Sequence, residues 1–319
     1  MRSAALLFNP RAGHRRGARW FRRIREELRR SFQLEEWATE GPRHCRELAR
    51  RAVERGYDAV FVLGGDGTLR VAATELAGTA TALGPLPGGT TNVVAHALGL
   101  PADPVAAARL LATAPTRELD VGRAGEGVFL MQVSGGLDAR VMAAVDPRWK
   151  RRFGKLAVAW CGFGEWRRYR FPEFTLEVDG ATTTATGFVV ANLAEYAGGF
   201  RIVPEARADD RQLELLLFRG RRRRDALGFA IDLVRGCHAA RADVEIRRIT
   251  SVRLLAPARL ALQGDGDPFA ATPPFELRLS SRRLRVLAPE AECRTADTIR
   301  RPRQAGSIDG RGVARPGGT

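Results

Sequence analysis

Cysteine is scarce in this sequence, and long apolar runs are missing. The four cysteines show no Cys-x-x-Cys spacing, which argues against a cysteine-based metal site or a disulfide framework and is typical of the reducing cytoplasm. No stretch approaches the roughly 18 apolar residues that a membrane-spanning helix requires, and the apolar run at residues 4–8 is too short for a signal-peptide core. We therefore predict a cytoplasmic protein whose contact with lipid is peripheral. The cysteines are Cys45, Cys161, Cys237 and Cys293.

Lysine is nearly absent, because all but Lys150 and Lys155 of the 52 basic residues are arginine. The formal net charge is nevertheless +16. A field of this sign attracts polyanions such as nucleotides, anionic membrane surfaces and nucleic acid. Composition therefore favours anionic partners, but it does not show which of these three classes binds.

The first 120 residues alternate between strand and helix patterns, which implies a doubly wound parallel α/β sheet with ligands at the carboxyl ends of its strands. From about Asp120 the pattern changes to short strands separated by turns, which predicts a mostly antiparallel β domain with two helices. In the first part we expect strands at 3–8, 33–38 and 58–63 and helices at 17–31 and 42–55. In the second part we expect strands at 127–134, 173–179, 185–192, 212–218, 244–256, 258–263 and 274–288, and helices at 153–164 and 225–237.

A glycine-rich motif, Gly64-Gly65-Asp66-Gly67-Thr68, follows the third predicted strand and opens a helix. Its glycines permit positive φ angles and let backbone N–H groups approach phosphate oxygens, while the helix adds its positive end. Asp66 would repel a phosphate unless it held Mg²⁺ or a hydroxyl, which suggests metal-assisted phosphoryl transfer. The alternative is a tight strand-to-helix turn with no ligand.

Two further loops follow predicted strands of the same sheet. Residues 85–92 end in Thr90, Thr91 and Asn92, which cap the next helix or contact a nucleotide. Residues 9–13 begin with Asn9, for which capping and a place at the ligand are equally open. Because the carboxyl ends of parallel strands share one edge, we expect the three loops to enclose one ATP.

These motifs resemble the diacylglycerol kinase catalytic domain, which sphingosine, ceramide and bacterial lipid kinases share. The resemblance rests on Asn-Pro-Arg-Ala-Gly at 9–13, Leu-Gly-Gly-Asp-Gly-Thr at 63–68, and Leu-Pro-Gly-Gly-Thr-Thr-Asn at 86–92, followed by Leu-Gly-Leu-Pro at 98–101. It extends over residues 2–289 through blocks at 120–122, 134–139, 153–156, 189–192, 198–199, 204–206 and 264–268.

The resemblance implies an ATP-dependent lipid kinase that transfers the γ-phosphate to a lipid hydroxyl with the help of Mg²⁺. It implies ATP in an active cleft between an α/β nucleotide domain, residues 1–120, and a β-sandwich-like lipid domain, residues 121–283. We expect residues 284–295 to pack back onto the first domain and predict disorder at 296–319, which are rich in Gly, Arg and Pro.

The resemblance also implies residue roles. Asp267 stands where the family usually has a glutamate as general base, and the neighbouring Asp265 matches the preceding aspartate. Because aspartate is one methylene shorter than glutamate, either the turn moves inward or Asp265 shares the role. Asp210 matches an aspartate that holds a structural Mg²⁺, although Arg211 replaces the usual glycine, and Arg70 stands where Asn is common. The predicted catalytic set is Asp66, Asp265 and Asp267, and Asp66 also binds the Mg²⁺ of ATP. The predicted nucleotide contacts are Asn9, Thr39, Gly64, Gly65, Asp66, Gly67, Thr68, Thr90 and Asn92.

Two stretches, 149–153 and 166–171, mix aromatic and basic residues and suit an anionic membrane surface, where the lipid substrate lies. The alternative is that the aromatic residues belong to the core and the arginines form a solvated rim. Single-stranded nucleic acid would also suit such stretches, but no nucleic-acid-binding motif accompanies them, so we do not favour it. A homodimer is left open.

Two other functions compete with the lipid kinase. NAD kinases resemble the chain at the glycine-rich motif and in the two-domain plan, but residues 86–92 and the blocks after residue 120 fit lipid kinases better. The other alternative is a catalytically idle protein that binds nucleotide or lipid, in which aspartate instead of glutamate at position 267 has removed the base.

Overall fold

The computed structural model describes residues 1–10, 17–146, 149, 155–196 and 199–290. Residues 1–289 form one compact unit. The predicted disorder at 296–319 and the end of the segment 284–295 lie outside the described residues, as do the first two residues of the predicted helix at 153–164. The domain boundaries at 120/121 and 283/284 stay a prediction.

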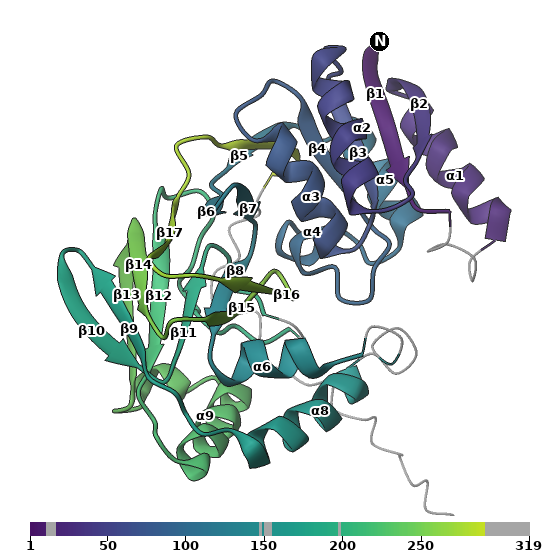
Figure 1. The fold of residues 1–319 in the computed structure, drawn as a ribbon. Helices are drawn as coiled ribbons and strands as arrows, with labels where there is room; N and C mark the ends of the chain where they lie inside the picture. The colour runs from purple at the N-terminus through teal and green to yellow at the C-terminus, as the bar shows by residue number, and fades with distance from the viewer. Residues whose placement is uncertain (11–16, 147–148, 150–154, 197–198, 291–319) are drawn as a thin grey trace, which may run out of the picture. The chain divides into compact units, whose positions relative to one another are not determined.

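The N-terminal part is a six-stranded sheet in the order β2-β1-β3-β4-β18-β5 (Figure 1). Every neighbouring pair is parallel except β18 and β5. Strands β3 and β4 are buried at every position, as strands are when helices cover both faces of a sheet. The strands are β1 Arg2–Phe8, β2 Phe32–Ala38, β3 Ala59–Gly64, β4 Ala82–Pro87, β5 Thr116–Leu119 and β18 Leu284–Leu287.

Five helices accompany this sheet, and α1 packs against α5 while α2 packs against α3. Helices α1 and α2 are strongly amphipathic, and α2 buries Cys45, Leu48, Ala49 and Ala52 while it exposes its arginines. The helices are α1 Gly17–Arg29, α2 Pro42–Glu54, α3 Asp66–Leu76, α4 Val93–Ala97 and α5 Pro104–Thr113. The predicted α/β fold is confirmed, with β5 as its antiparallel edge.

The C-terminal part contains two six-stranded antiparallel sheets, β10-β9-β14-β17-β6-β7 and β13-β12-β11-β8-β15-β16. Alternating apolar residues of both sheets, among them Phe129, Leu176, Phe188 and Leu254, share one core, so the sheets form a sandwich. This confirms the predicted mostly antiparallel, sandwich-like domain. The strands are β6 Gly122–Ala124, β7 Gly127–Phe129, β8 Gln132–Gly135, β9 Phe174–Val178, β10 Ala181–Ala185, β11 Gly187–Ala191, β12 Leu213–Phe218, β13 Val244–Ile249, β14 Ser251–Ala256, β15 Leu260–Gly264, β16 Asp267–Ala271 and β17 Phe275–Leu279.

The helices of this part are α6 Leu137–Ala144, α8 Lys155–Arg168 and α9 Arg223–Arg235, with a short 3₁₀ turn at His238–Ala240. Helix α6 packs against α8 and against β15 and β16. Helix α9 packs on the sheet that contains β12, where Phe229 and Leu233 join an apolar cluster around Val189 and Leu216.

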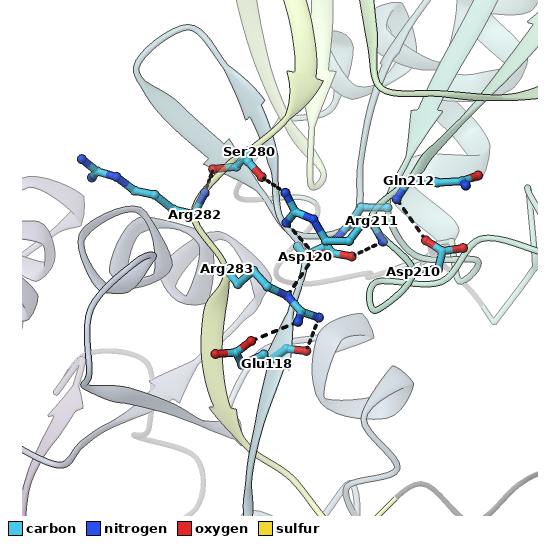
Figure 2. A network of polar contacts seen from close by, with 9 residues as sticks. Glu118, Asp120, Asp210, Arg211, Gln212, Ser280, Arg282 and Arg283 are labelled. Atoms are coloured by element: carbon cyan, nitrogen blue, oxygen red, sulfur yellow. Dashed lines mark hydrogen bonds and ion pairs between the residues drawn. The ribbon is translucent and has the colours of Figure 1, made fainter.

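The chain passes twice between the α/β part and the β-rich part, and the buried carboxylate of Asp120, at the first crossing, is hydrogen-bonded to Arg283 at the second (Figure 2). The chain leaves the first sheet after β5 and returns between β17 and β18. Asp120 accepts hydrogen bonds from the backbone N–H and Nη1 of Arg211, at 2.6 and 3.0 Å, and from Nε of Arg283, at 3.1 Å. Arg211 also donates to the carbonyl of Ser280, and Arg283 to that of Glu118. Arg211, just before β12, and Arg283, just before β18, therefore connect both crossings to the carboxylate of Asp120.

Replacing Asp120 by Ala should lower the free energy of unfolding by about 2–3 kcal/mol, because it leaves two arginines without their buried partner. We expect less than the full cost of breaking a buried pair because both guanidinium groups are partly exposed. Urea unfolding measures this, with Glu118→Ala as control, since Glu118 also pairs with Arg283 but is 55% exposed. Equal losses in the two variants would contradict the assigned role.

Candidate active site

The glycine-rich motif forms a very tight connection, in which β3 ends at Gly64 and α3 begins at Asp66. None of Gly64, Gly65 and Gly67 has a positive φ, so that part of our explanation of the motif is wrong. The glycines are needed for close approach instead. A Cβ on Gly89 would lie 2.6 Å from the Cα of Gly65, so the first and second loops touch backbone to backbone.

Asp66 joins these two loops rather than facing a ligand. Its carboxylate is buried and accepts hydrogen bonds from the backbone N–H groups of Val93 and Val94, at 3.1 and 3.0 Å, and from Oγ1 of Thr91 at 3.2 Å. Both oxygens thus cap the start of α4. The predicted catalytic and Mg²⁺-binding role of Asp66 stays a prediction, and in this structure its carboxylate is engaged within the protein.

The second loop is closed by Asn92. Its Oδ1 accepts from the N–H of Gly89 at 2.7 Å and its Nδ2 donates to the carbonyl of Gly89 at 3.1 Å, with Asn92 itself in the left-handed region at φ 48°. Thr90, which lies between Gly89 and Asn92 in the sequence, is exposed. The loop therefore holds its own shape and presents Thr90 outward.

The remaining predicted nucleotide residues lie at the carboxyl ends of neighbouring parallel strands. Asn9 follows β1, and buried Thr39 follows β2 and donates its backbone N–H to the carbonyl of Phe8 at 2.8 Å. Thr68 lies against Gly64, where a Cβ would come within 2.9 Å of the threonine Cβ. The structure therefore brings Asn9, Thr39 and both glycine loops to one edge of the sheet, while residues 11–13 of the loop that begins at Asn9 lie outside the described residues.

The second-domain turn is the hairpin between β15 and β16. Gly264 pairs with Asp267, and Asp265 and Gly266 form a two-residue turn with φ values of 51° and 84°, which is typical of a type I′ turn. The side chain of Asp265 is buried and accepts from the backbone N–H groups of residues 130–132 at 2.8–3.0 Å. Burial raises the pKa of Asp265 to about 6, although these N–H groups oppose that shift. Asp265 therefore anchors the hairpin, and its predicted share in the base stays a prediction.

Asp267 is the carboxylate that reaches the glycine-rich motif. A Cβ on Gly67 would lie 2.8 Å from Oδ2 of Asp267, and Nη2 of Arg70 donates to the same oxygen at 3.0 Å. The Asp267 side chain is 54% exposed, so its carboxylate is accessible. Arg70 and Gly67 both belong to the first turns of α3, so the hairpin brings an accessible anion to the start of that helix.

Sequence reasoning missed the network that supports this hairpin. Gln263 accepts from the N–H of Gly266 at 2.8 Å and donates to Ser134 and Asp138, at 2.8 and 3.0 Å. Asp138 is also hydrogen-bonded to Ser134 and to the hydroxyl of Tyr196. Burial, followed by the nearby Asp138, raises the pKa of Tyr196. Asp138 and Ser134 lie in the block at 134–139 that carries the family resemblance, but spacing alone does not reveal their partners.

Asp210 lies in a local turn and accepts only from the N–H of Gln212, at 3.1 Å, among the hydrogen bonds of the described residues. The positively charged neighbour is Arg211, at φ 63°, which pairs with Asp120. Over the described part of the chain, no group of three or more His, Cys, Asp and Glu side chains is arranged to hold a metal ion. The predicted structural Mg²⁺ site on Asp210, which would use one carboxylate and two backbone oxygens, stays a prediction.

Of the two aromatic and basic stretches, 149–153 lies outside the described residues except for Trp149. In the other, Trp166 is half-buried and donates its Nε1 to the carbonyl of Arg223 at 3.0 Å, and Tyr169 is buried. Here the aromatic residues pack inward, as in the alternative interpretation. Among the described helices, none has the length and apolar character needed to cross a bilayer.

Comparison with protein families yields two adjacent matches. Residues 3–124 match the model of the diacylglycerol kinase catalytic domain. Residues 131–288 match the model described as the YegS C-terminal NAD kinase beta sandwich-like domain. The first match ends just after Asp120, and together they span both parts of the described fold.

Individual relatives are similar over most of the chain. A diacylglycerol kinase from Mycobacterium tuberculosis is 31% identical over 255 residues, which is 77% of this chain and 81% of that protein. A protein named probable lipid kinase YegS-like, from Chromohalobacter salexigens, is 31% identical over 69% of this chain and 73% of its own length. The crystal structure of a diacylglycerol kinase from Bacillus anthracis covers 90% of this chain and 97% of its own, with a TM-score of 0.67 at 19% identity, which shows a shared fold.

Glu214 should make stability depend on pH. Its side chain is 2% exposed, no hydrogen bond within the described residues reaches its oxygens, and burial, then Asp210, raises its pKa to about 7. Because the folded protein holds this proton more tightly than the unfolded chain, the stability that Glu214 contributes is complete below pH 4.5 and is lost as the pH rises through about 7.

We therefore expect Glu214→Gln to match wild type at about pH 4 and to exceed it at pH 8 by up to about 3 kcal/mol. Urea unfolding at both pH values measures the difference. The control is Glu245→Gln, because Glu245 lies on the neighbouring strand but is 42% exposed, and its effect should not change with pH. A gain from Glu214→Gln that is the same at both pH values would contradict this account.

Proposed function

The chain belongs to the diacylglycerol kinase catalytic-domain family of lipid kinases, and we propose that it transfers the γ-phosphate of ATP to the hydroxyl of diacylglycerol or a related lipid. The observation that carries this proposal is the contact of Asp267 with the start of α3. It brings an accessible carboxylate from the β-rich part to the phosphate-binding motif of the α/β part, as transfer between a nucleotide and a second substrate requires.

ATP would bind at the edge of the first sheet, beside Thr39, Thr68 and Thr90. The positive end of α3 and the net charge of +16 favour its phosphates there. Mg²⁺ enters as part of the substrate, held chiefly by phosphate oxygens, because the oxygens of Asp66 are already engaged. When bound, the ion would neutralise charge on the transferred phosphoryl group.

Asp267 would act as the general base. Its carboxylate accepts the proton of the lipid hydroxyl as that oxygen forms a bond to the γ-phosphorus, and the bond from phosphorus to the departing oxygen of ADP breaks. The proton then passes from Asp267 to solvent. Arg70, hydrogen-bonded to Asp267, would orient the carboxylate and stabilise negative charge nearby. We further propose that the enzyme works in the cytoplasm, in peripheral contact with an anionic membrane surface.

Removing the base should abolish transfer but not ATP binding. In an assay of labelled γ-phosphate transfer to a lipid panel in anionic micelles, Asp267→Asn should lower kcat by about 100-fold or more, with a nearly unchanged KM for ATP. Asp267→Glu, which restores the residue common in the family, should remain active. The control is Glu276→Gln, an exposed carboxylate on β17.

Two results would overturn the proposal. Labelled NADP with no labelled lipid would make the protein a NAD kinase. ATP binding by folded wild type, without transfer to any lipid or to NAD, would make it an idle binding protein.

The space left by Gly67 should be essential for the same step. A methyl group there would meet Oδ2 of Asp267 at 2.8 Å and displace the base or the hairpin, so Gly67→Ala should lower kcat by at least about tenfold without unfolding the protein. Gly162→Ala in helix α8 is the matched control, because its methyl group would make only an ordinary contact, at 3.9 Å, with Val141. Full activity of Gly67→Ala would refute the assigned position of Asp267.

A further inference from the structure

Helix α9 has two apolar faces, of which only one is buried. Phe229 and Leu233 pack against the sheet. Leu227, Ile231 and Val234, spaced four and three residues apart, share the other side and are 49%, 42% and 67% exposed. A surface helix of a globular protein normally exposes polar residues on that side. The outer side of α9 is therefore built to meet something apolar.

Helix α8 adds two larger side chains. Trp160 and Phe163, three residues apart, are 78% and 58% exposed. The hydrogen bond from Trp166 to the carbonyl of Arg223 ties the end of α8 to the start of α9. Five of the eight large apolar side chains that are exposed in the described part of the chain belong to these helices. We call the five, Trp160, Phe163, Leu227, Ile231 and Val234, the outer apolar face.

Arginines surround the outer apolar face. Arg167 and Arg168 end α8, residues 221–224 lead into α9, and Arg235 ends it. Arg167, Arg168 and Arg223 are exposed and make no ion pair with any acidic side chain that the structure describes. These guanidinium groups are therefore available to an anionic partner.

The acidic residues of the two helices do not offset this charge, because each is engaged within the protein. Asp225 accepts from backbone N–H groups that lead into α9, Asp232 pairs with Arg241 at 2.7 Å, and Glu165 pairs with Arg140 at 3.1 Å. The rim of the outer apolar face is thus positive, around an apolar centre.

We propose that the outer apolar face and its arginine rim dock the protein on an anionic lipid bilayer. Tryptophan and phenylalanine enter the headgroup zone, and the arginines pair with lipid phosphates. A second copy of the chain is disfavoured as occupant, because a two-fold contact through this face would bring the two positive rims together.

The outer apolar face lies on elements that connect to the proposed catalytic base, as an enzyme that acts on membrane lipid requires. In this respect the inference rests on the proposed function. Helix α8 packs on α6, and α6 contributes Asp138, which bonds to Gln263 beside the hairpin that ends in Asp267. A lipid surface against α8 and α9 would therefore lie next to the elements that support the proposed base.

Sedimentation with vesicles tests the inference. Wild type should bind phosphatidylglycerol–phosphatidylcholine vesicles more tightly than pure phosphatidylcholine ones. Trp160→Gln with Ile231→Gln should weaken binding to both by at least about tenfold. Arg167→Gln with Arg223→Gln should remove the preference for anionic vesicles, because their charge supplies it. The control, Arg22→Gln with Arg23→Gln on α1, loses the same charge elsewhere and should stay within about twofold of wild type.

Activity measurements separate this inference from the proposed function. Variants of the outer apolar face should phosphorylate a short-chain lipid dispersed as monomers at the wild-type rate, and vesicle-bound lipid more slowly. If wild type binds vesicles but phosphorylates no lipid, the docking surface stands and the proposed function falls. If wild type is active but does not bind anionic vesicles, or the variants bind as well as wild type, the docking inference is wrong. Dimers of wild type that the variants lose, with unchanged vesicle binding, would assign the face to a second copy instead.

Discussion

A carboxylate from a β-hairpin meets the first turn of a helix at a position where only glycine leaves room. Oδ2 of Asp267 lies 2.8 Å from the position that a Cβ on Gly67 would take, and Arg70 donates a hydrogen bond to the same oxygen. This contact imposes demands on both sides. The hairpin must be rigid, which Gln263 and the buried Asp265 ensure, and α3 must begin immediately after β3. The glycine-rich motif is therefore a packing requirement of the protein itself as well as a phosphate-binding shape.

Three aspartates with similar sequence surroundings take different roles because their burial and donors differ. Asp66 and Asp265 are buried, and each accepts hydrogen bonds from several backbone N–H groups, so they fix loops. Asp267 remains about half exposed and has a guanidinium as partner. A buried carboxylate with its oxygens satisfied stabilises a structure, whereas an accessible one can exchange a proton with a substrate. Of the three, Asp267 is therefore the carboxylate that suits the proposed role of general base.

Arginine supplies positive charge both beside a buried carboxylate and on the exposed surface of two helices. Arg211 and Arg283 compensate the buried Asp120, so the crossings between the two parts rely on the chain's own cations. On α8 and α9 the same residue type remains free at the rim of an apolar face. A guanidinium serves in both settings because it is weakly hydrated, always charged and able to bind several acceptors.

Periodicity and glycine spacing in the sequence determined the α/β sheet, the antiparallel β part and the edge at which the loops meet. These follow from local patterns, because buried strands need apolar runs. Only the tertiary structure decided which carboxylate is accessible, what Arg70 and Asp120 pair with, and which aromatic residues face outward. Those outcomes depend on contacts between residues far apart in the chain, such as Asp267 with Arg70 or Trp166 with Arg223, and local spacing carries no information about them.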